Sequence, residues 1–159
     1  MNPAPSTKSC LAALFAGSLL LAACQSPAPP QAQTPREIHT AAYDLLIPAE
    51  QQSLLILFPC FPCDAADTRA ESPIADTAVA NGITVLMMNF NQHILMSDAE
   101  KLEVLDVIVG AVKEHGLDAT NTVIGGFSSG GNVSVLLAKE LVRAPRPGIG
   151  LKGVFAVDS

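Results

Sequence analysis

The 159-residue sequence has little charge and few aromatic side chains. Only 15% of its residues are charged, 4% are aromatic, and tryptophan is absent. Acidic residues outnumber basic ones by 15 to 9, giving a formal net charge of −6. Nucleic-acid binding needs basic residues that neutralise phosphates, and single strands are usually held on aromatic rings. The composition therefore argues against nucleic acid as a partner.

The sequence is nevertheless apolar enough to build a core. Hydrophobic residues make up 49% of the chain, which rules out a wholly disordered protein. The length corresponds to one ordinary domain. We find no internal repeat and neither the lysine of a phosphate-binding P-loop nor a G-x-G-x-x-G fingerprint, so no nucleotide cofactor is expected.

The N-terminal apolar stretch, residues 10–23, is short for a membrane-spanning helix, which needs about 20 apolar residues. It follows the single charge of Lys8 and ends in Leu-Ala-Ala-Cys, the order found in secretory signal peptides. The ending resembles the bacterial lipoprotein box. This resemblance implies cleavage before Cys24, acylation of Cys24 and attachment to a lipid bilayer. The alternative is an ordinary signal peptide with an incidental cysteine.

Residues 25–35 are rich in proline, glutamine and alanine and are typical of an extended tether. Gln25, rather than aspartate, follows Cys24, which in a bacterial envelope favours the outer membrane over the inner one. The sequence is therefore divided into a signal peptide (1–23), a lipidated cysteine with its tether (24–40) and a domain (41–159).

Within the domain, strand-like and helix-like segments alternate. Continuous apolar runs at residues 53–58, 83–90 and 122–127 are typical of strands buried on both faces of a parallel sheet. Shorter strands are expected at 43–47 and 153–157. The alternation predicts a doubly wound, mostly parallel α/β sheet.

Three helices are expected between these strands. Residues 98–115 have a capping box of Ser97 with Glu100 and a stop at Gly116. Their apolar stripe consists of Leu102, Leu105, Ile108, Val109 and Val112. The other helices are expected over 67–80, where Pro73 disturbs the pattern, and over 131–142.

One motif in the domain points to chemistry. Gly126-Phe127-Ser128-Ser129-Gly130 matches G-x-S-x-G, and it lies between an expected strand and an expected helix. This is the setting of a nucleophile elbow, in which a tight turn exposes the serine at the edge of the sheet. The N–H of Ser129 would then lie at a helix N-terminus, where it can bind the oxyanion formed when a carbonyl is attacked.

With this motif and its flanking elements, residues 43–159 resemble the α/β-hydrolase family. The resemblance implies that Ser128 is the nucleophile and that the loop 59–64 supplies a second oxyanion donor. That loop is glycine-rich in many lipases and esterases but not here, and we assign the donor to Phe61. The substrate class implied is a small ester or amide, without a cofactor.

The resemblance also implies an acid and a histidine after the serine, because the base needs an orienting acid. His39, His93 and His115 all precede Ser128. Asp158 follows the expected last strand and is either the acid or a residue that caps a turn. We therefore expect the sequence to be the N-terminal part of a longer protein, truncated before the last strands of the fold.

Cys60 and Cys63 form a C-x-x-C motif. A structural disulfide or a pair of loop thiols is the favoured interpretation, and a thioredoxin-like redox pair is the alternative. No metal site is expected, because no histidine lies near enough in sequence to complete one.

Three functions therefore remain open: a lipid-anchored serine hydrolase of the bacterial envelope, a non-catalytic lipoprotein with the same fold, and a thiol–disulfide protein.

Overall fold

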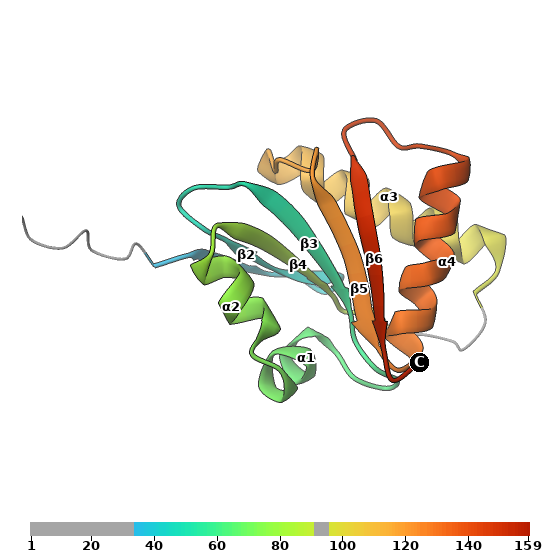
Figure 1. The fold of residues 1–159 in the computed structure, drawn as a ribbon, viewed down its shortest axis with the longest axis horizontal. Coiled ribbons are helices and arrows are strands. Elements are labelled where there is room, and N and C mark those ends of the chain that lie inside the picture. Colours follow the sequence, from blue (N-terminus) through green and yellow to red (C-terminus); the bar gives the residue numbers. More distant parts are fainter. Residues whose placement is uncertain (1–33, 91–95) are drawn as a thin grey trace, which may run out of the picture. The chain divides into compact units, whose positions relative to one another are not determined.

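A computed structural model of the protein describes residues 34–90 and 96–159, which contain six strands and four helices (Figure 1). Their bounds, in chain order, are β1 Arg36–His39, β2 Tyr43–Ile47, β3 Ser53–Phe58, α1 Ala65–Glu71, α2 Ile74–Ala80, β4 Ile83–Met88, α3 Asp98–His115, β5 Thr122–Phe127, α4 Ser129–Arg143 and β6 Leu151–Val157.

The strands form one sheet in the order β1-β2-β4-β3-β5-β6. The four strands from β4 to β6 are parallel, while β1 and β2 are antiparallel additions at one edge. The parallel strands all run toward the same edge, where the loops after β3, β5 and β6 meet (Figure 1). The predicted mostly parallel α/β sheet is confirmed.

Helices cover both faces of this sheet. On one face, α3 and α4 pack over a core that includes Ile56, Ile108 and Leu137. On the other face, α1 and α2 pack over a smaller core with Leu57, Ala75 and Met87. Strands β3 and β4 are almost wholly buried, which explains their continuous apolar sequences.

The capping signals of α3 are confirmed. Ser97 accepts a hydrogen bond from the Glu100 N–H, the Glu100 side chain returns to the Ser97 N–H, and Gly116 ends the helix with a φ of 63°. The predicted apolar stripe is partly wrong. The buried residues are Val104, Leu105, Ile108 and Ala111, whereas Leu102 is 42% exposed. The buried face is thus shifted around the helix, because packing on the sheet rather than hydrophobicity selects it.

Other boundaries also differ from the sequence pattern. Residues 36–39, assigned to the tether, form β1 and pair with β2. The single helix expected over 67–80 is two helices separated at Pro73, which lacks the N–H that a continuous helix would need. Helix α4 starts at Ser129, two residues earlier than expected, and so begins directly after the serine turn.

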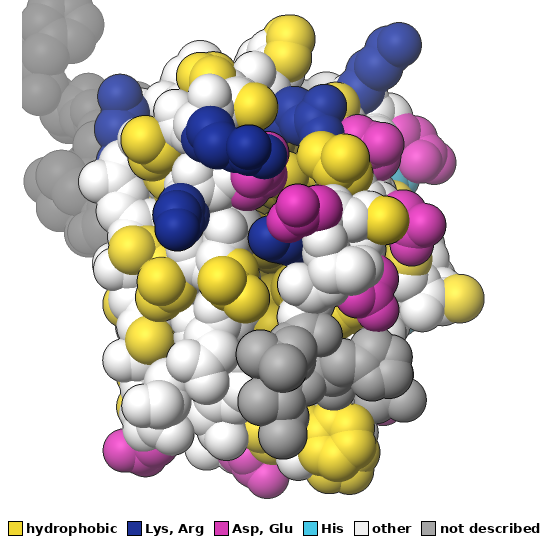
Figure 2. Space-filling view, turned by 90° about the vertical axis from the view of Figure 1, so that its right-hand side faces the viewer, with side chains coloured by type: hydrophobic (Ala, Val, Ile, Leu, Met, Phe, Trp, Pro, Cys, Tyr) yellow, Lys and Arg dark blue, Asp and Glu magenta, His cyan; other side chains and the backbone are white. Residues whose placement is uncertain are grey.

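The surface over α3 and α4 carries charges of both signs (Figure 2). Arg143 lies 2.9 Å from Glu140, and Lys101 lies 2.6 Å from Asp98. Exposed hydrophobic side chains such as Val142 lie on the same helices.

Among the described helices, none is long and apolar enough to cross a membrane. Cys24, the predicted signal peptide and the first part of the tether lie outside the described residues.

Candidate active site

Ser128 lies in the turn between β5 and α4 with φ 51° and ψ −122°. A positive φ is uncommon for a residue with a side chain, and such strained residues cluster at functional sites. The turn is held by the Ser128 N–H, which donates to the Val157 carbonyl at 2.8 Å, and by the Gly131 N–H, which donates to the Ser128 carbonyl at 2.9 Å. The Ser128 side chain is left exposed. The turn thus combines a positive φ with an exposed serine side chain.

The two glycines of the motif are required by close backbone packing. A Cβ on Gly130 would lie 2.3 Å from the Phe58 carbonyl oxygen and 2.4 Å from that of Pro59. A Cβ on Gly126 would lie 2.5 Å from the Gly130 backbone. The start of α4 therefore contacts the end of β3 directly, and this contact explains the G-x-S-x-G spacing.

Ser129 is the first residue of α4 and is only 8% exposed. Backbone N–H groups at a helix N-terminus point out of the helix and carry a partial positive charge. The 15-residue helix α4 thus directs this end toward the place where Ser128 is presented. Such an arrangement can stabilise a developing negative charge.

The loop after β3 is closed by a disulfide between Cys60 and Cys63. The Cys63 N–H also donates to the Cys60 carbonyl at 2.8 Å, so the loop is a tight turn. Asp64 then caps α1 through a capping box with Asp67, and the Ala65 N–H donates to the Asn89 side chain at 2.9 Å. Of the two favoured alternatives, a structural disulfide and a pair of loop thiols, the structure has the disulfide.

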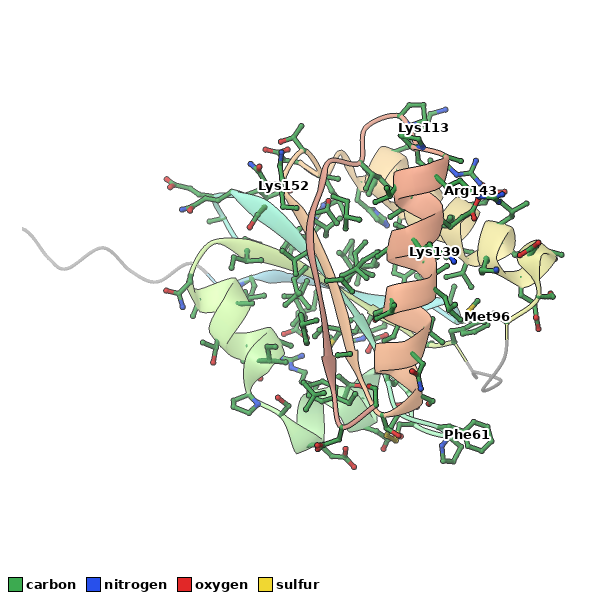
Figure 3. The ribbon with its side chains drawn as sticks, turned by 45° about the vertical axis from the view of Figure 1, so that its right-hand side comes forward. Phe61, Met96, Lys113, Lys139, Arg143 and Lys152 are labelled. Carbon is green, nitrogen blue, oxygen red and sulfur yellow. A yellow bond between two sulfur atoms is a disulfide. The ribbon has the colours of Figure 1, made fainter. Side chains whose placement is uncertain are left out.

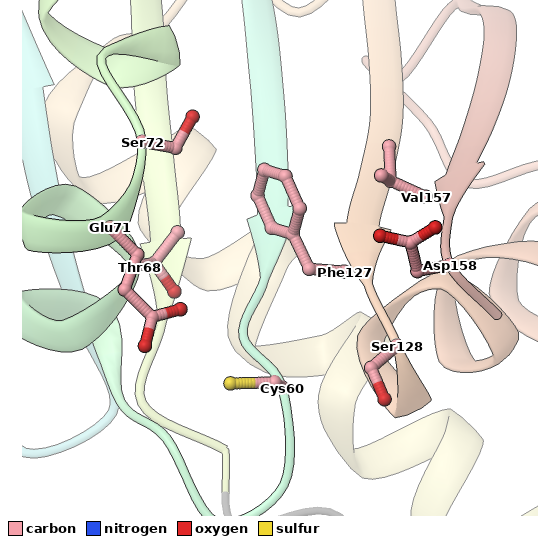
Figure 4. Close-up of a pocket in the computed structure, with 8 residues that line it drawn as sticks. All are labelled: Cys60, Thr68, Glu71, Ser72, Phe127, Ser128, Val157 and Asp158. Atoms are coloured by element: carbon pink, nitrogen blue, oxygen red, sulfur yellow. The ribbon is translucent and has the colours of Figure 1, made fainter.

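A cavity of about 250 Å³ opens beside Ser128 (Figure 4). Ser128 and Asp158 lie on one side, and the α1 residues Thr68 and Glu71 lie on the other. The full lining is Cys60, Thr68, Glu71, Ser72, Phe127, Ser128, Val157 and Asp158. No lysine or arginine is among these residues, so the charged groups of the cavity are carboxylates.

Asp158 shares the cavity with Ser128. It follows β6 directly and has a φ of 52°, so the chain turns sharply at this point. Across residues 34–90 and 96–159, its carboxylate makes no hydrogen bond or ion pair. The next residue, Ser159, donates its hydroxyl to the Ser128 carbonyl at 2.8 Å. This hydrogen bond therefore links the end of the described chain, just after β6, to the serine turn.

Phe61, the residue assigned as second oxyanion donor, does not line the cavity. Its side chain is 57% exposed and projects outward from the loop (Figure 3). Cys60, one residue earlier, lines the cavity instead.

The two described histidines lie elsewhere, and neither lines the cavity. His39 lies on β1, with its Nδ1 atom 3.0 Å from an Asp44 carboxylate oxygen. The Nε2 atom of His115, at the end of α3, lies 2.9 Å from the Tyr43 hydroxyl. Burial, together with the nearby Glu114 carboxylate, raises the pKa of Tyr43. His93 falls outside the described residues.

The wall opposite Ser128 was not predicted from the sequence. Thr68 and Glu71 come from α1, and Ser72 follows that helix. Arg69 links the same helix to its neighbours. It donates two hydrogen bonds of 3.1 Å to Glu37 of β1 and two, of 3.0 and 2.8 Å, to Asp76 of α2. The Arg69 guanidinium holds the pKa of the Glu37 carboxyl below its ordinary value. These residues carry no local motif. They reach the serine turn because α1 follows the loop after β3, and β3 lies next to β5 in the sheet.

No family model matches the chain. A search of curated proteins likewise found no match. Solved structures do resemble it. An esterase from Rhizomucor miehei aligns with a TM-score of 0.55 and 18% identity, over 77% of this chain and 42% of the esterase. An acetyl xylan esterase from Aspergillus awamori aligns with a TM-score of 0.52 and 13% identity, over 69% of this chain and 49% of the esterase. A dienelactone hydrolase from Anabaena variabilis aligns with a TM-score of 0.50 and 15% identity, over 78% of this chain and 63% of the hydrolase.

These similarities, together with the sheet order and the serine turn, identify the α/β-hydrolase fold. At this level of identity the likeness establishes the fold and not the activity. The chain spans between 42% and 63% of the length of these three structures.

Proposed function

We propose that this chain carries the nucleophile part of a serine hydrolase of the esterase, lipase or peptidase type. The observation that supports this most strongly is Ser128 itself: an exposed serine with positive φ, located between a buried strand and a helix N-terminus and facing a cavity. Strain of this kind costs about 1–3 kcal/mol and persists where the surrounding structure imposes it. A serine in an ordinary connecting turn would not need it.

In the proposed reaction, the Ser128 Oγ attacks the carbonyl carbon of an ester or amide and loses its proton to a general base. The N–H of Ser129 and that of Cys60 bind the resulting oxyanion. We favour Cys60 over Phe61, the residue assigned from the resemblance, because Cys60 lines the cavity beside Ser128. The bond to the leaving alcohol or amine then breaks as that group takes up the proton, and water hydrolyses the acyl-serine.

The base and its orienting acid complete the proposal. Asp158 is the candidate acid, because its carboxylate shares the cavity with Ser128 and has no hydrogen-bond partner among the described residues. Neither His39 nor His115 lines that cavity, and His93 lies outside the described residues. On the basis of the family resemblance, we propose that the base is a histidine after Ser128 that a longer gene product supplies. We also propose that the protein is anchored in a bacterial envelope through acylated Cys24, on the basis of the lipoprotein-like sequence alone.

A non-catalytic role on the same fold is the second candidate. It is favoured by the absence of a described histidine from the cavity. In that case the cavity would bind a small molecule without cleaving it.

A fluorophosphonate probe separates the two candidates, because it reacts with an activated serine. The test uses the 159-residue chain and the product of its gene read through any downstream coding sequence. We expect labelling at Ser128 in the product that supplies the histidine, and its loss in Ser128→Ala. Ser97→Ala, which changes a serine of the α3 cap away from the cavity, is the matched control. A folded product with an Asp and a His downstream that is not labelled would refute the hydrolase proposal.

A further inference from the structure

Two cysteines and a carboxylate converge at the cavity beside Ser128. The Sγ atoms of Cys60 and Cys63 and a carboxylate oxygen of Glu71 all lie within 4.8 Å of one another. Cys60 and Cys63 belong to the loop after β3, and Glu71 is the last residue of α1. Figure 4 shows the sulfur of Cys60 directed toward the side of the cavity that carries Glu71.

We propose that reduction of the Cys60–Cys63 disulfide creates a binding site for a thiophilic divalent cation such as Zn²⁺, with Cys60, Cys63 and Glu71 as its protein ligands. Two thiolates and a carboxylate are ordinary zinc ligands, and C-x-x-C is a common ligand spacing. Three protein ligands leave a fourth position open for water. The sequence alone supplied two of these ligands, and the fold adds the third from a different element.

The loop holds this arrangement by means other than the disulfide. The hydrogen bond from the Cys63 N–H to the Cys60 carbonyl closes the turn at the backbone. The capping box of Asp64 then fixes the start of α1, the helix that carries Glu71. In the chain-entropy model, a disulfide stabilises a fold less the shorter the loop it closes, and this loop spans only three residues of sequence separation. We therefore expect the reduced chain to keep its fold and to hold the two thiols near each other.

Glu71 is available as a ligand. It is exposed, and it makes no hydrogen bond or ion pair with the residues at 34–90 and 96–159. Arg69, two residues earlier, is already engaged by Glu37 and Asp76 and does not neutralise it. Reduction would thus place two ionisable thiols beside an uncompensated carboxylate, and a divalent cation would balance this charge.

The chemistry is balanced with a dithiol as the reductant. Two hydrogen atoms pass from the dithiol to the protein, the bond between the Cys60 and Cys63 sulfurs breaks, and the reductant becomes a disulfide. Zn²⁺ then displaces one proton from each thiol and binds both thiolates. In the reverse direction, a disulfide oxidant accepts the two electrons and two protons and becomes a dithiol, while the metal is released and the Cys60–Cys63 bond re-forms. The site therefore exists in the reduced state only.

Metal titration tests the proposal directly. The full chain is reduced with a phosphine, exchanged into metal-free buffer and titrated with Zn²⁺ against a chromogenic chelator. Co²⁺ is used in parallel, because thiolate ligation gives it an ultraviolet charge-transfer band. We expect one equivalent of Zn²⁺ bound by the reduced chain and none by the oxidised chain. Absence of stoichiometric binding by the folded, reduced chain would overturn the proposal.

Variants identify the ligands. We expect Cys60→Ser/Cys63→Ser to abolish binding and the charge-transfer band, and Glu71→Gln to weaken zinc affinity by about tenfold or more. Glu103→Gln removes the same charge from exposed α3 and should leave affinity unchanged. Equal affinity in Glu71→Gln and the wild type would overturn the three-ligand site. A reduced chain that is unfolded without metal but refolds with one equivalent of Zn²⁺ supports it, whereas one that stays unfolded overturns it.

The cavity provides a separate readout that rests on the proposed hydrolase function. Because Cys60, Glu71 and Ser128 line one cavity, bound Zn²⁺ should slow fluorophosphonate labelling of Ser128 in the reduced protein. The labelling is measured in the gene product that supplies the histidine, and its failure there without metal would count against the hydrolase. Failure of metal binding in the titration would count against the site, so the two results are distinguishable.

Discussion

Replacing Gly130 by alanine tests whether the start of α4 must contact the end of β3. The added Cβ would lie 2.3 Å from the Phe58 carbonyl oxygen, which is 0.7 Å inside the 3.0 Å limit that real Cβ atoms respect. A second backbone oxygen, that of Pro59, lies at 2.4 Å. Both obstacles are backbone atoms on a buried strand and its exit, so neither can rotate away. The helix would have to move off the sheet.

The magnitude follows from two opposing effects. Alanine in place of glycine inside a helix gains about 0.5–1 kcal/mol, because less backbone entropy is lost on folding. Forcing an extra carbon into a packed site costs about 1–3 kcal/mol. Because the obstacles at Gly130 are backbone atoms, the upper part of this cost, about 2–3 kcal/mol, applies. We therefore expect Gly130→Ala to lower the free energy of unfolding by about 1–2.5 kcal/mol.

Gly110→Ala is the matched control. Gly110 lies inside α3, is exposed, and has nothing within 4 Å of the position its Cβ would take. The same chemical change should therefore raise the free energy of unfolding by about 0.5–1 kcal/mol. The two variants are predicted to shift stability in opposite directions.

Urea denaturation followed by far-UV circular dichroism measures both effects, since the chain lacks the tryptophan that fluorescence would need. A Gly130→Ala protein as stable as the wild type would refute the packing argument. So would a destabilised Gly110→Ala protein, because the loss could then no longer be attributed to the contact with β3.

Three further predictions concern stability. Arg69 lowers the pKa of Glu37 in the folded protein. The ion pair therefore stabilises the fold fully above the ordinary carboxyl pKa, and this stabilisation is lost as the pH falls through the lowered pKa of the folded state. When urea titrations at about pH 5 and pH 3 are compared, the free energy of unfolding should fall less in Glu37→Gln than in the wild type. The difference should be under about 1 kcal/mol, because both side chains are partly exposed. Equal losses in the two proteins would count against the ion pair. Ile108→Ala, at a fully buried position, should cost about 2–5 kcal/mol in urea denaturation. Val107→Ala, the exposed neighbour, should change stability little, and similar losses in both would contradict the assigned buried face. Ser97→Ala should cost about 0.5–2 kcal/mol through loss of the α3 cap; an unchanged urea midpoint would exclude that role.

Several parts of the fold could be predicted from sequence because they depend on neighbouring residues. The runs at β3 and β5 are apolar throughout, since parallel strands are buried on both faces. The ends of α3 are marked by Ser97, Glu100 and Gly116, whose side chains or φ preference act within one turn.

Other elements depend on partners that local sequence does not reveal. Strand β1, Arg36–His39, is polar and short, and it is a strand because β2 supplies its hydrogen-bonding partner. The buried face of α3 includes Ala111 and leaves Leu102 exposed, because the surface of the sheet decides which residues fit. Such features arise from packing, to which hydrophobicity is only a partial guide.

The candidate site divides in the same way. Local sequence marked the serine turn and the C-x-x-C motif, because each motif lies within five consecutive residues. The contact of Gly130 with the end of β3 is tertiary. The family resemblance implied that Ser128, the loop 59–64 and Asp158 lie together, whereas only the tertiary structure decided that Cys60 and Asp158 share one cavity with Glu71 of α1. These residues lie on separate elements, and they meet because parallel β3, β5 and β6 end at the same edge of the sheet while α1 folds back across it. Strand order is a property of the whole fold, so no local pattern could have revealed that meeting.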